Sequence, residues 1–221
     1  KKIIKDEKME VKPCPPHLKN TVHVSGFSEE RLKLKHSGEK AHVIQMLEKQ
    51  IVTKHIIEEV PCAEKDGEKY FESNEEYQKI AVIERHKNTG KMGVGIVKGY
   101  GIRGGAIASS VSHDSHNIIV VGDNDHDMAL AVKEMIRTQG GYTLVCNGEI
   151  YGTLPLPVMG LMSDAGYESV NEALARMIPK AHEMGVKDGF DPFITLSFMA
   201  LPVIPEIRIT PRGIYLVRQD A

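Results

Sequence analysis

Residues 109–141, SSVSHDSHNIIVVGDNDHDMALAVKEMIRTQGG, combine a polar run, an apolar run and a long amphipathic segment. The apolar run, 118–121, contains only Ile and Val, which predicts a buried strand. The amphipathic segment predicts a helix, because its apolar residues recur at helical spacing and two glycines follow it. This unit predicts a helix that packs against a sheet. Three side chains at its start can cap the helix, and two glycines can end it: Asp123, Asn124 and Asp125, then Gly140 and Gly141.

Other elements are expected on both sides of this unit. A second helix is expected at about 169–184, capped within 164–168, stopped by Gly185 and kinked or interrupted by Pro179. Residues 53–60 fit a strand or a helical turn equally well. The remaining strands are expected within 41–47, 79–86, 88–112, 142–157 (a hairpin at Asn147-Gly148), 192–198 and 206–217 (a hairpin at Pro211-Arg212-Gly213).

Strands outnumber helices in this pattern. The expected fold class is therefore α+β (mixed α/β), a mixed β-sheet with two main helices and no TIM barrel. Residues 1–25 are expected to lie outside the main domain. They comprise a short hairpin that turns at Asp6-Glu7-Lys8, followed by the proline-rich linker KPCPPH. The main domain is expected to span 26–221, with its boundary near 20–26.

The composition is that of a soluble globular protein, with 41% hydrophobic and 26% charged residues. A net charge of −2 without a long basic run argues against a nucleic-acid surface and against electrostatic membrane attachment. No stretch approaches the roughly 18 apolar residues that a membrane span needs. Three widely spaced cysteines, Cys14, Cys62 and Cys146, favour a reducing compartment, so a cytoplasmic location is expected.

The polar run Ser112-His113-Asp114-Ser115-His116-Asn117 is the first candidate site. Its plainest interpretation is a turn whose side chains satisfy backbone groups. A histidine beside a carboxylate also suits acid–base chemistry or substrate contact, because histidine titrates near neutrality. A metal site is the third interpretation, with Asp123 and His126 nearby, although H-x-x-H spacing alone is a weak signal. The two histidines converge only if this segment turns.

Three further patterns have both a structural and a functional interpretation. Glu84-Arg85-His86 follows a buried strand, where ligand contacts are often placed, but a salt-bridged sheet edge is the plainer interpretation. The glycine-rich segment 90–105 lacks both G-x-G-x-x-G before a helix and G-K-[ST], which favours close strand packing over phosphate binding. Four methionines fit either core filling in a chain without Trp or a partner surface: Met159, Met162, Met184 and Met199.

No pattern is a complete catalytic motif by itself. The ten histidines form no H-x-H and no H-E-x-x-H. G-x-S-x-G is absent, and no cysteine lies in a nucleophile signature. The residues alone therefore leave the function open.

Long stretches nevertheless resemble a known family. Residues 80–133 and 153–217, together with 50–60, resemble the C-terminal domain of bacterial and archaeal adenine deaminase, of the amidohydrolase superfamily. The similarity covers most of 22–217. Its most specific motifs are SHDSHNIIVVG at 112–122, LPLPVMGLMSD at 154–164 and PFITLSFMALPVIPEIRITPRG at 192–213.

The resemblance implies an enzyme that converts adenine and water to hypoxanthine and ammonia with a divalent metal: manganese, iron or zinc. In that superfamily a TIM-like barrel bearing an H-x-H motif holds the metal, and metal-bound hydroxide attacks the purine. This sequence has no H-x-H. The resemblance therefore implies that the barrel lies outside this chain and that the chain contains no metal ligand. It also implies two partners, the protein's own N-terminal barrel and a second copy in a homodimer.

The same resemblance suggests roles for the polar residues. His113, Asp114 and His116 are expected to close the purine pocket or act in acid–base catalysis, with substrate contacts from Arg85, His86, Ser112 and Asn117. Two alternatives remain. One is a non-catalytic binding or oligomerisation module. The other is a small metalloenzyme built on His113, Asp114 and His116, with His126 as a further ligand.

Overall fold

The computed structural model describes residues 14–36 and 38–217. The expected hairpin at 1–11 lies outside this part of the chain. Eight strands form one sheet in the order β10-β9-β7-β8-β5-β6-β1-β2. They are β1 (Ala41–Met46), β2 (Thr53–Glu58), β5 (Tyr77–Ile83), β6 (Met92–Lys98), β7 (Gly105–Ser109), β8 (Ile118–Gly122), β9 (Gly141–Cys146) and β10 (Glu149–Pro155). Adjacent strands are antiparallel except β1 and β6, which are parallel.

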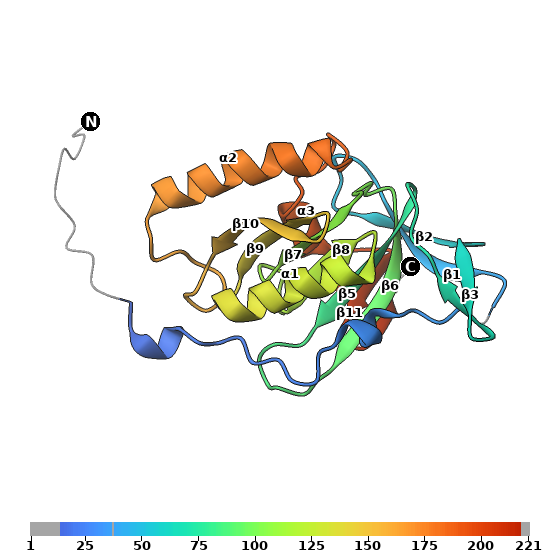
Figure 1. Ribbon diagram of the computed structural model, residues 1–221, viewed down its shortest axis with the longest axis horizontal. Helices are drawn as coiled ribbons and strands as arrows, with labels where there is room; N and C mark the ends of the chain where they lie inside the picture. Colours follow the sequence, from blue (N-terminus) through green and yellow to red (C-terminus); the bar gives the residue numbers. More distant parts are fainter. Residues whose placement is uncertain (1–13, 37, 218–221) are drawn as a thin grey trace.

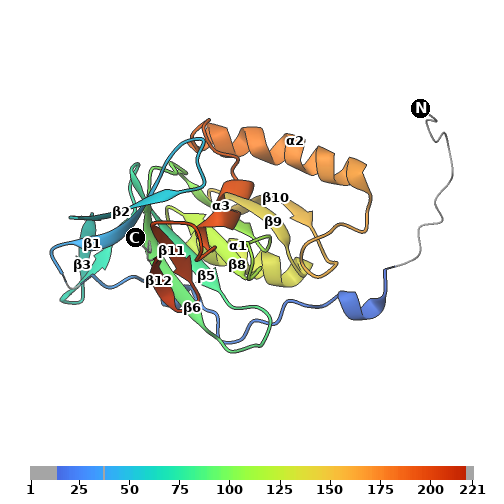
Figure 2. The ribbon, with the colours of Figure 1, turned by 180° about the vertical axis from the view of Figure 1, so that it is seen from behind.

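Helices cover both faces of this mixed sheet (Figures 1 and 2). Helix α1 (Asp125–Thr138) lies on one face, while α3 (Ile194–Met199) and the hairpin of β11 (Ile207–Thr210) and β12 (Gly213–Leu216) lie on the other. Helix α2 (Tyr167–Glu183) packs against β10. The remaining elements are the exposed hairpin of β3 (Cys62–Lys65) and β4 (Glu68–Phe71) and two 3-10 turns, Pro16–Leu18 and Glu29–Leu32. The α+β expectation is confirmed, and the described strands close no barrel.

The apolar runs in the central strands supply two hydrophobic layers at once. Successive side chains of a strand point to opposite faces. In β5, Ile80 and Val82 face the layer beneath α2, α3 and β11, while Ala81 and Ile83 face the layer beneath α1. β8 alternates in the same way. Continuous apolar runs therefore form strands here because both faces are covered.

The predicted capping of α1 is confirmed at Asn124, whose side chain accepts the Asp127 backbone N–H at 2.8 Å. The helix ends at Thr138, two residues before the first of the predicted glycines. Gln139 adopts the left-handed conformation with φ 60°, and the Gly140 N–H donates to Met135 O at 2.9 Å. These bonds satisfy backbone groups that a helix end leaves unpaired.

The predicted strand at 192–198 is wrong, because this segment contains helix α3. The Asp191 carboxylate accepts the backbone N–H groups of Phe193 and Ile194, at 2.9 and 2.8 Å, and so starts the turn. Phe193, Leu196 and Met199 are buried at a spacing of three residues. A short apolar run fits the period of a strand or of a helix. Here the helical period brings the three buried side chains to the core.

Other expectations were resolved by the structure. Residues 53–60, which fitted a strand or a turn, contain β2, and both predicted hairpins form around their expected turns. Helix α2 continues through Pro179 without interruption. Its N-cap is Gly166, within the predicted range 164–168, and a glycine has no side chain with which to cap the helix. The expected interruption at Pro179 is therefore wrong, and the alternative, a kink at this residue, stays a prediction.

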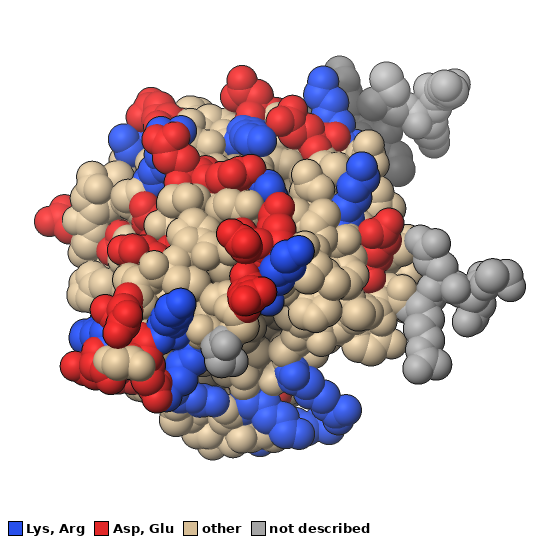
Figure 3. Space-filling model, turned by 90° about the vertical axis from the view of Figure 1, so that its right-hand side faces the viewer, with Lys and Arg blue, Asp and Glu red and all other residues tan. Residues whose placement is uncertain are grey.

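The glycine-rich segment serves close packing, as predicted. A β-carbon at Gly93 would lie 2.1 Å from Thr210 O, so only glycine lets the β11–β12 turn lie against β6. A β-carbon at Gly105 would lie 2.1 Å from Val145 O of β9. Acidic and basic side chains are interspersed on the face shown in Figure 3. None of the described helices is long and apolar enough to cross a membrane.

The N-terminal segment packs on the same sheet. Val22 and Leu32 belong to the layer beneath α1, and Leu18 O accepts the Met159 N–H at 2.7 Å. Lys19 forms an ion pair with Asp164. The segment from about residue 18 onward therefore contacts both the α1 face and the loop before α2, while the predicted boundary near 20–26 stays a prediction.

Candidate functional site

Two polar segments meet at one end of the central strands. Ile83, the last residue of β5, pairs with Ile118, the first residue of β8. Because these strands are antiparallel, the segment that follows β5 lies beside the segment that precedes β8. The tertiary structure therefore joins Glu84-Arg85-His86 to the run 112–117.

The run 112–117 forms the turn that brings its histidines together. The His116 N–H donates to Ser112 O at 2.5 Å, and His116 adopts a left-handed conformation with φ 48°. The rings of His113 and His116 are 6.0 Å apart between centroids. His113 also contacts helix α3. Its backbone N–H donates to Ser197 O at 3.0 Å, and the centroid of its ring lies 5.2 Å from that of Phe198. The segment thus turns, which is the condition under which the two histidines could come together.

The members of this turn differ in their access to solvent. Asp114 and Ser115 are exposed, and His113 and His116 are partly buried. Ser112 is fully buried, and its hydroxyl has no hydrogen-bond partner among the described residues. The turn therefore presents Asp114 and the histidines outward and encloses Ser112.

Arg85 is a buried cation held by carbonyl groups. It is 1% exposed, and among the described residues its guanidinium forms no ion pair. Its Nε donates to His116 O and its Nη2 donates to Met159 O at 3.0 Å. Its Nη1 is 3.5 Å from Thr21 O. Burial lowers the pKa of Arg85 to about 10, so the group stays charged at neutral pH.

The salt-bridged sheet edge predicted for Glu84-Arg85-His86 does not form. The Glu84 carboxylate instead accepts the N–H groups of His86, Lys87 and Thr89, at 2.6 to 3.1 Å, and the Thr89 hydroxyl at 2.8 Å. Burial alone would raise the pKa of Glu84, but these donors lower it to about 2. Glu84 therefore orders the turn that follows β5.

The two remaining candidates connect the segments. The exposed His86 ring extends to the histidine turn, with its Nε2 2.7 Å from Ser115 O. Asn117 is buried, and its side-chain oxygen accepts the Arg85 backbone N–H at 3.3 Å. Asn117 thus holds the two segments together, while His86 lies at the surface.

Two cavities flank these segments. One, of about 340 Å³, is lined by Thr21, His23, Arg85, His86, His116, Met159 and Leu161. The other is a wider groove of about 700 Å³ between the turn after β5, the histidine turn and the β11–β12 turn. His86 lines both. The Arg85–His116 region is therefore accessible, although Arg85 itself is buried.

The His116 ring favours its neutral form. Burial lowers the pKa of His116, and Arg85 and His113 lower it further, whereas Asp114 opposes the shift. The His116 Nδ1 atom is buried without a partner in the described part of the chain. A neutral ring with a free nitrogen can donate or accept one hydrogen bond to a ligand in the smaller cavity.

The described residues do not fit a resident metal. Within 14–36 and 38–217, no three or more His, Cys, Asp or Glu residues group so that they could hold a metal ion. His126, the suggested extra ligand, lies in the first turn of α1 with its Nδ1 3.4 Å from Glu29. The hypothesis of a self-contained metalloenzyme therefore has no ligand set in this part of the chain.

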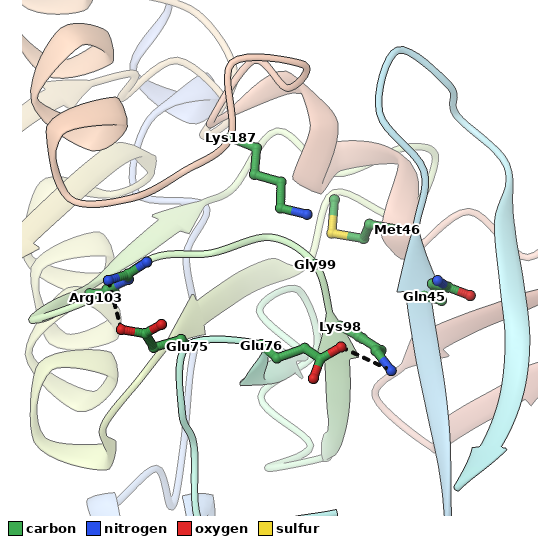
Figure 4. Close-up of a pocket in the computed structure, with 8 residues that line it drawn as sticks. All are labelled: Gln45, Met46, Glu75, Glu76, Lys98, Gly99, Arg103 and Lys187. Atoms are coloured by element: carbon green, nitrogen blue, oxygen red, sulfur yellow. Dashed lines mark hydrogen bonds and ion pairs between the residues drawn. The ribbon is translucent and has the colours of Figure 1, made fainter.

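A separate cavity of about 300 Å³ lies near β1 and β6 (Figure 4). Its charged groups are paired, some with one another and Lys187 with Glu48 at 3.8 Å outside the lining. Lys98 lies 3.1 Å from Glu76, and Arg103 lies 2.8 Å from Glu75. Lys98 also lies 2.9 Å from Glu58, which does not line the cavity. Because these charges are already paired, this cavity offers a ligand fewer free charged groups than the region around Arg85 does.

Sequence reasoning missed the residues that complete the smaller cavity. Thr21 and His23 lie in the segment before the sheet, and Met159 and Leu161 lie in the loop before α2. Of the four methionines, Met184 and Met199 fill the core, whereas Met159 and Met162 are exposed. No local pattern could have identified Thr21 or His23, because only the fold brings them to Arg85.

Comparisons with known proteins agree on one family. The family model described as the adenine deaminase C-terminal domain matches residues 50–221. The chain is 50% identical over 215 residues to a protein named adenine deaminase from Desulfitobacterium hafniense (strain Y51), an alignment that covers 97% of this chain and 37% of that protein. It is 44% identical over 204 residues to the adenine deaminase of Nitratidesulfovibrio vulgaris (strain DP4), covering 92% of this chain and 35% of that protein. For the adenine deaminase of Bacillus subtilis (strain 168) the identity is 42% over 210 residues, and the coverage is 94% and 34%. The chain thus spans about a third of the length of these curated relatives.

Proposed function

Because the chain belongs to the adenine deaminase C-terminal domain family, we propose that it acts as part of a longer adenine deaminase, a hydrolase that converts adenine and water to hypoxanthine and ammonia. The observation that carries this proposal is the 50% identity to a protein of that name over 97% of the chain. The chain aligns with only 37% of that relative, so the proposal assigns the rest of the activity to the remaining part of the enzyme.

The proposal places the divalent metal, manganese, iron or zinc, in a barrel outside this chain. The described residues offer no group that fits such an ion. The chain is accordingly proposed to complete or cap the active site rather than to catalyse by itself. Adenine and the protein's own N-terminal barrel are then its partners, and the cytoplasm, where the three free cysteines would stay reduced, is the proposed location.

Within the longer enzyme, the histidine turn is proposed to close the purine pocket. Asp114 is exposed on this turn, and the partly buried rings of His113 and His116 lie side by side. The neutral form that burial favours for His116 suits a hydrogen bond to a purine nitrogen. Arg85, Ser112 and Asn117 would support this turn from within, since all three are buried, and His86 would lie at its edge.

The test uses the longer enzyme from the same source. His113→Ala and His116→Ala are each expected to lower adenine turnover or to raise KM at least about tenfold, as for a lost acid–base or substrate contact. His42→Ala, at an exposed histidine on β1, two strands away from β5, is the matched control and should leave both constants unchanged. Unchanged kcat and KM in both turn variants would contradict the role proposed for the turn.

A second candidate function is a non-catalytic oligomerisation module, through which the chain would form a homodimer. The observation that favours it is an apolar groove of about 480 Å³, with exposed Met162 and Tyr167 at its edge. The discriminating experiment compares adenine deamination and metal content of this chain alone, of the longer protein, and of this chain mixed with the separately expressed remainder. Activity gained on mixing supports the deaminase role. Dimerisation of this chain in analytical ultracentrifugation, without any such gain, supports the module.

A further inference from the structure

The smaller cavity beside the histidine turn contains a buried positive charge without a negative partner. Arg85 is 1% exposed, forms no ion pair within the described residues, and lines this cavity of about 340 Å³. A guanidinium has five N–H donors. Of these, one bonds His116 O, one bonds Met159 O, and one reaches Thr21 O only at 3.5 Å. Some N–H donors of Arg85, mainly at Nη1, therefore have no acceptor among the described residues.

Arg208 is an internal comparison, because it is equally buried and also lacks an ion pair in the described chain. Its two Nη atoms donate to Thr53 Oγ1 and to the carbonyls of Ile207, Ile51 and Pro205, at 2.7 to 3.1 Å. Arg208 lines none of the cavities described above. Its Nη donors are engaged by protein and its Nε is buried without a partner among the described residues, so it is a structural arginine, whereas Arg85 lines a cavity.

Two other polar atoms of the same cavity also lack partners. The Thr21 hydroxyl and His116 Nδ1 are buried without a hydrogen bond among the described residues, although both residues line the cavity. Buried polar groups are rarely left unpaired, so a ligand or an ordered water is needed to satisfy the two that belong to residues of this one cavity. Each can donate: the hydroxyl always, and Nδ1 in the tautomer that carries its proton there.

The charge of the lining selects the sign of that ligand. No Asp or Glu lines the cavity, whereas Arg85, His23, His86 and His116 do. Met159 and Leu161 line the cavity with apolar side chains, and the burial of Arg85 at 1% exposure lowers the local dielectric and so strengthens the attraction of an anion to the guanidinium. His23 and His86 are exposed, so an ion can enter past them.

We propose that this cavity binds a small oxyanion, a carboxylate or phosphate group, through Arg85 Nη1, the Thr21 hydroxyl and His116 Nδ1. Guanidinium groups bind these planar or tetrahedral oxygen sets through paired, charge-assisted hydrogen bonds. The oxyanion is either a free ion or a carboxylate side chain from elsewhere in a longer protein. The site needs no deaminase activity, so its failure would leave the proposed function untouched.

The test measures binding of inorganic phosphate and of acetate to this chain by isothermal titration calorimetry, at ionic strength held constant with chloride. Saturable binding of at least one ion is expected. Arg85→Lys should weaken it more than about tenfold, because lysine keeps the charge but loses the fork of donors. Thr21→Val, which replaces the hydroxyl with a methyl group of similar size, should weaken it about threefold to tenfold.

Thr143→Val is the matched control, since Thr143 also has a buried, unpartnered hydroxyl but lines none of the described cavities. It should bind as the wild type does. If Arg85→Lys fails to fold, Thr21→Val and the response of the His116 ring signals in NMR titrations decide the question. Lack of saturable binding by the wild type, or binding unchanged in Arg85→Lys and Thr21→Val, overturns the proposal.

The same titration of the longer protein separates the two sources of the oxyanion. Binding with the same affinity identifies a free ion. Binding to this chain but not to the longer protein identifies a side-chain carboxylate that already fills the cavity. Both outcomes keep Arg85, Thr21 and His116 as the oxyanion site.

Discussion

Gly160 lies directly against the guanidinium of Arg85. A β-carbon at Gly160 would come within 2.7 Å of Arg85 Nη1 and 2.9 Å of its Cζ. Gly160 also has φ +71°, a conformation that other residues adopt at a cost. Two segments 75 positions apart in the chain thus share one wall of the smaller cavity. The glycine is what allows the arginine to lie where it does.

Gly160→Ala should therefore cost more than a left-handed glycine ordinarily does. We expect a loss of about 2–4 kcal/mol in the free energy of unfolding, because the methyl group both strains the backbone and displaces the Arg85 hydrogen bonds. Gly148→Ala is the control, with φ +81° and nothing within 4 Å of its β-carbon. It should cost about 1–2 kcal/mol. Urea unfolding measures both, and equal losses would show that the contact with Arg85 is unimportant.

Glu84 should make the free energy of unfolding depend on pH in the acid range. Its pKa is about 2 in the folded chain against an ordinary value of 4.5, so the charged carboxylate favours folding. This contribution is complete above about pH 4.5 and is lost as the pH falls towards 2. Glu84→Gln should thus be less stable than wild type at pH 7. The difference in the free energy of unfolding between the two proteins should become smaller below pH 4.5.

Urea unfolding at several pH values between 7 and 3 checks this expectation for Glu84. Glu64→Gln, at an exposed position in β3, serves as the control and should show no such narrowing. A gap for Glu84→Gln that stays constant over the acid range would rule out the linkage.

Asn124 should stabilise α1 through its cap. Asn124→Ala removes the acceptor of the Asp127 N–H and is expected to cost about 1 kcal/mol. Asn124→Ser keeps an oxygen acceptor and should recover most of that loss. Thermal unfolding followed by circular dichroism compares the three proteins. A serine variant no more stable than the alanine variant would mean that the loss arises elsewhere, for example in the amide contacts to Asp123 and Asp127.

Tyr100 should anchor the segment that precedes α3. Its fully buried hydroxyl donates to Pro192 O at 2.7 Å. Tyr100→Phe leaves that carbonyl unpaired and is expected to cost about 1–3 kcal/mol. Tyr142→Phe is the control, since Tyr142 stacks on Phe193 but its hydroxyl makes no hydrogen bond within the described residues. Chemical denaturation should show a loss of less than about 1 kcal/mol for the control, and similar losses for both would contradict the anchoring role.

The candidate site was only partly predictable from the sequence. The run 112–117 and the triplet 84–86 stood out because ionisable residues rarely flank apolar strands so densely. Their position beside one another follows from the pairing of β5 with β8, which periodicity alone does not specify. The predicted sheet-edge salt bridge of Arg85 was wrong, because the buried guanidinium found carbonyl groups in place of a carboxylate.

By itself, the sequence determined which segments form strands and helices wherever a pattern was long or bounded by strong turn residues. Helix α1, with its cap, and the hairpin at Asn147-Gly148 are examples, because burial on a strand or helix leaves a periodic record along the chain. At 192–198 the apolar segment was too short to distinguish the period of a helix from that of a strand. Only the tertiary structure decided the cavity at Arg85, whose contacts with Thr21 and Met159 span 64 and 74 residues. Such contacts depend on strand order and loop path, and neither leaves a local pattern in the sequence.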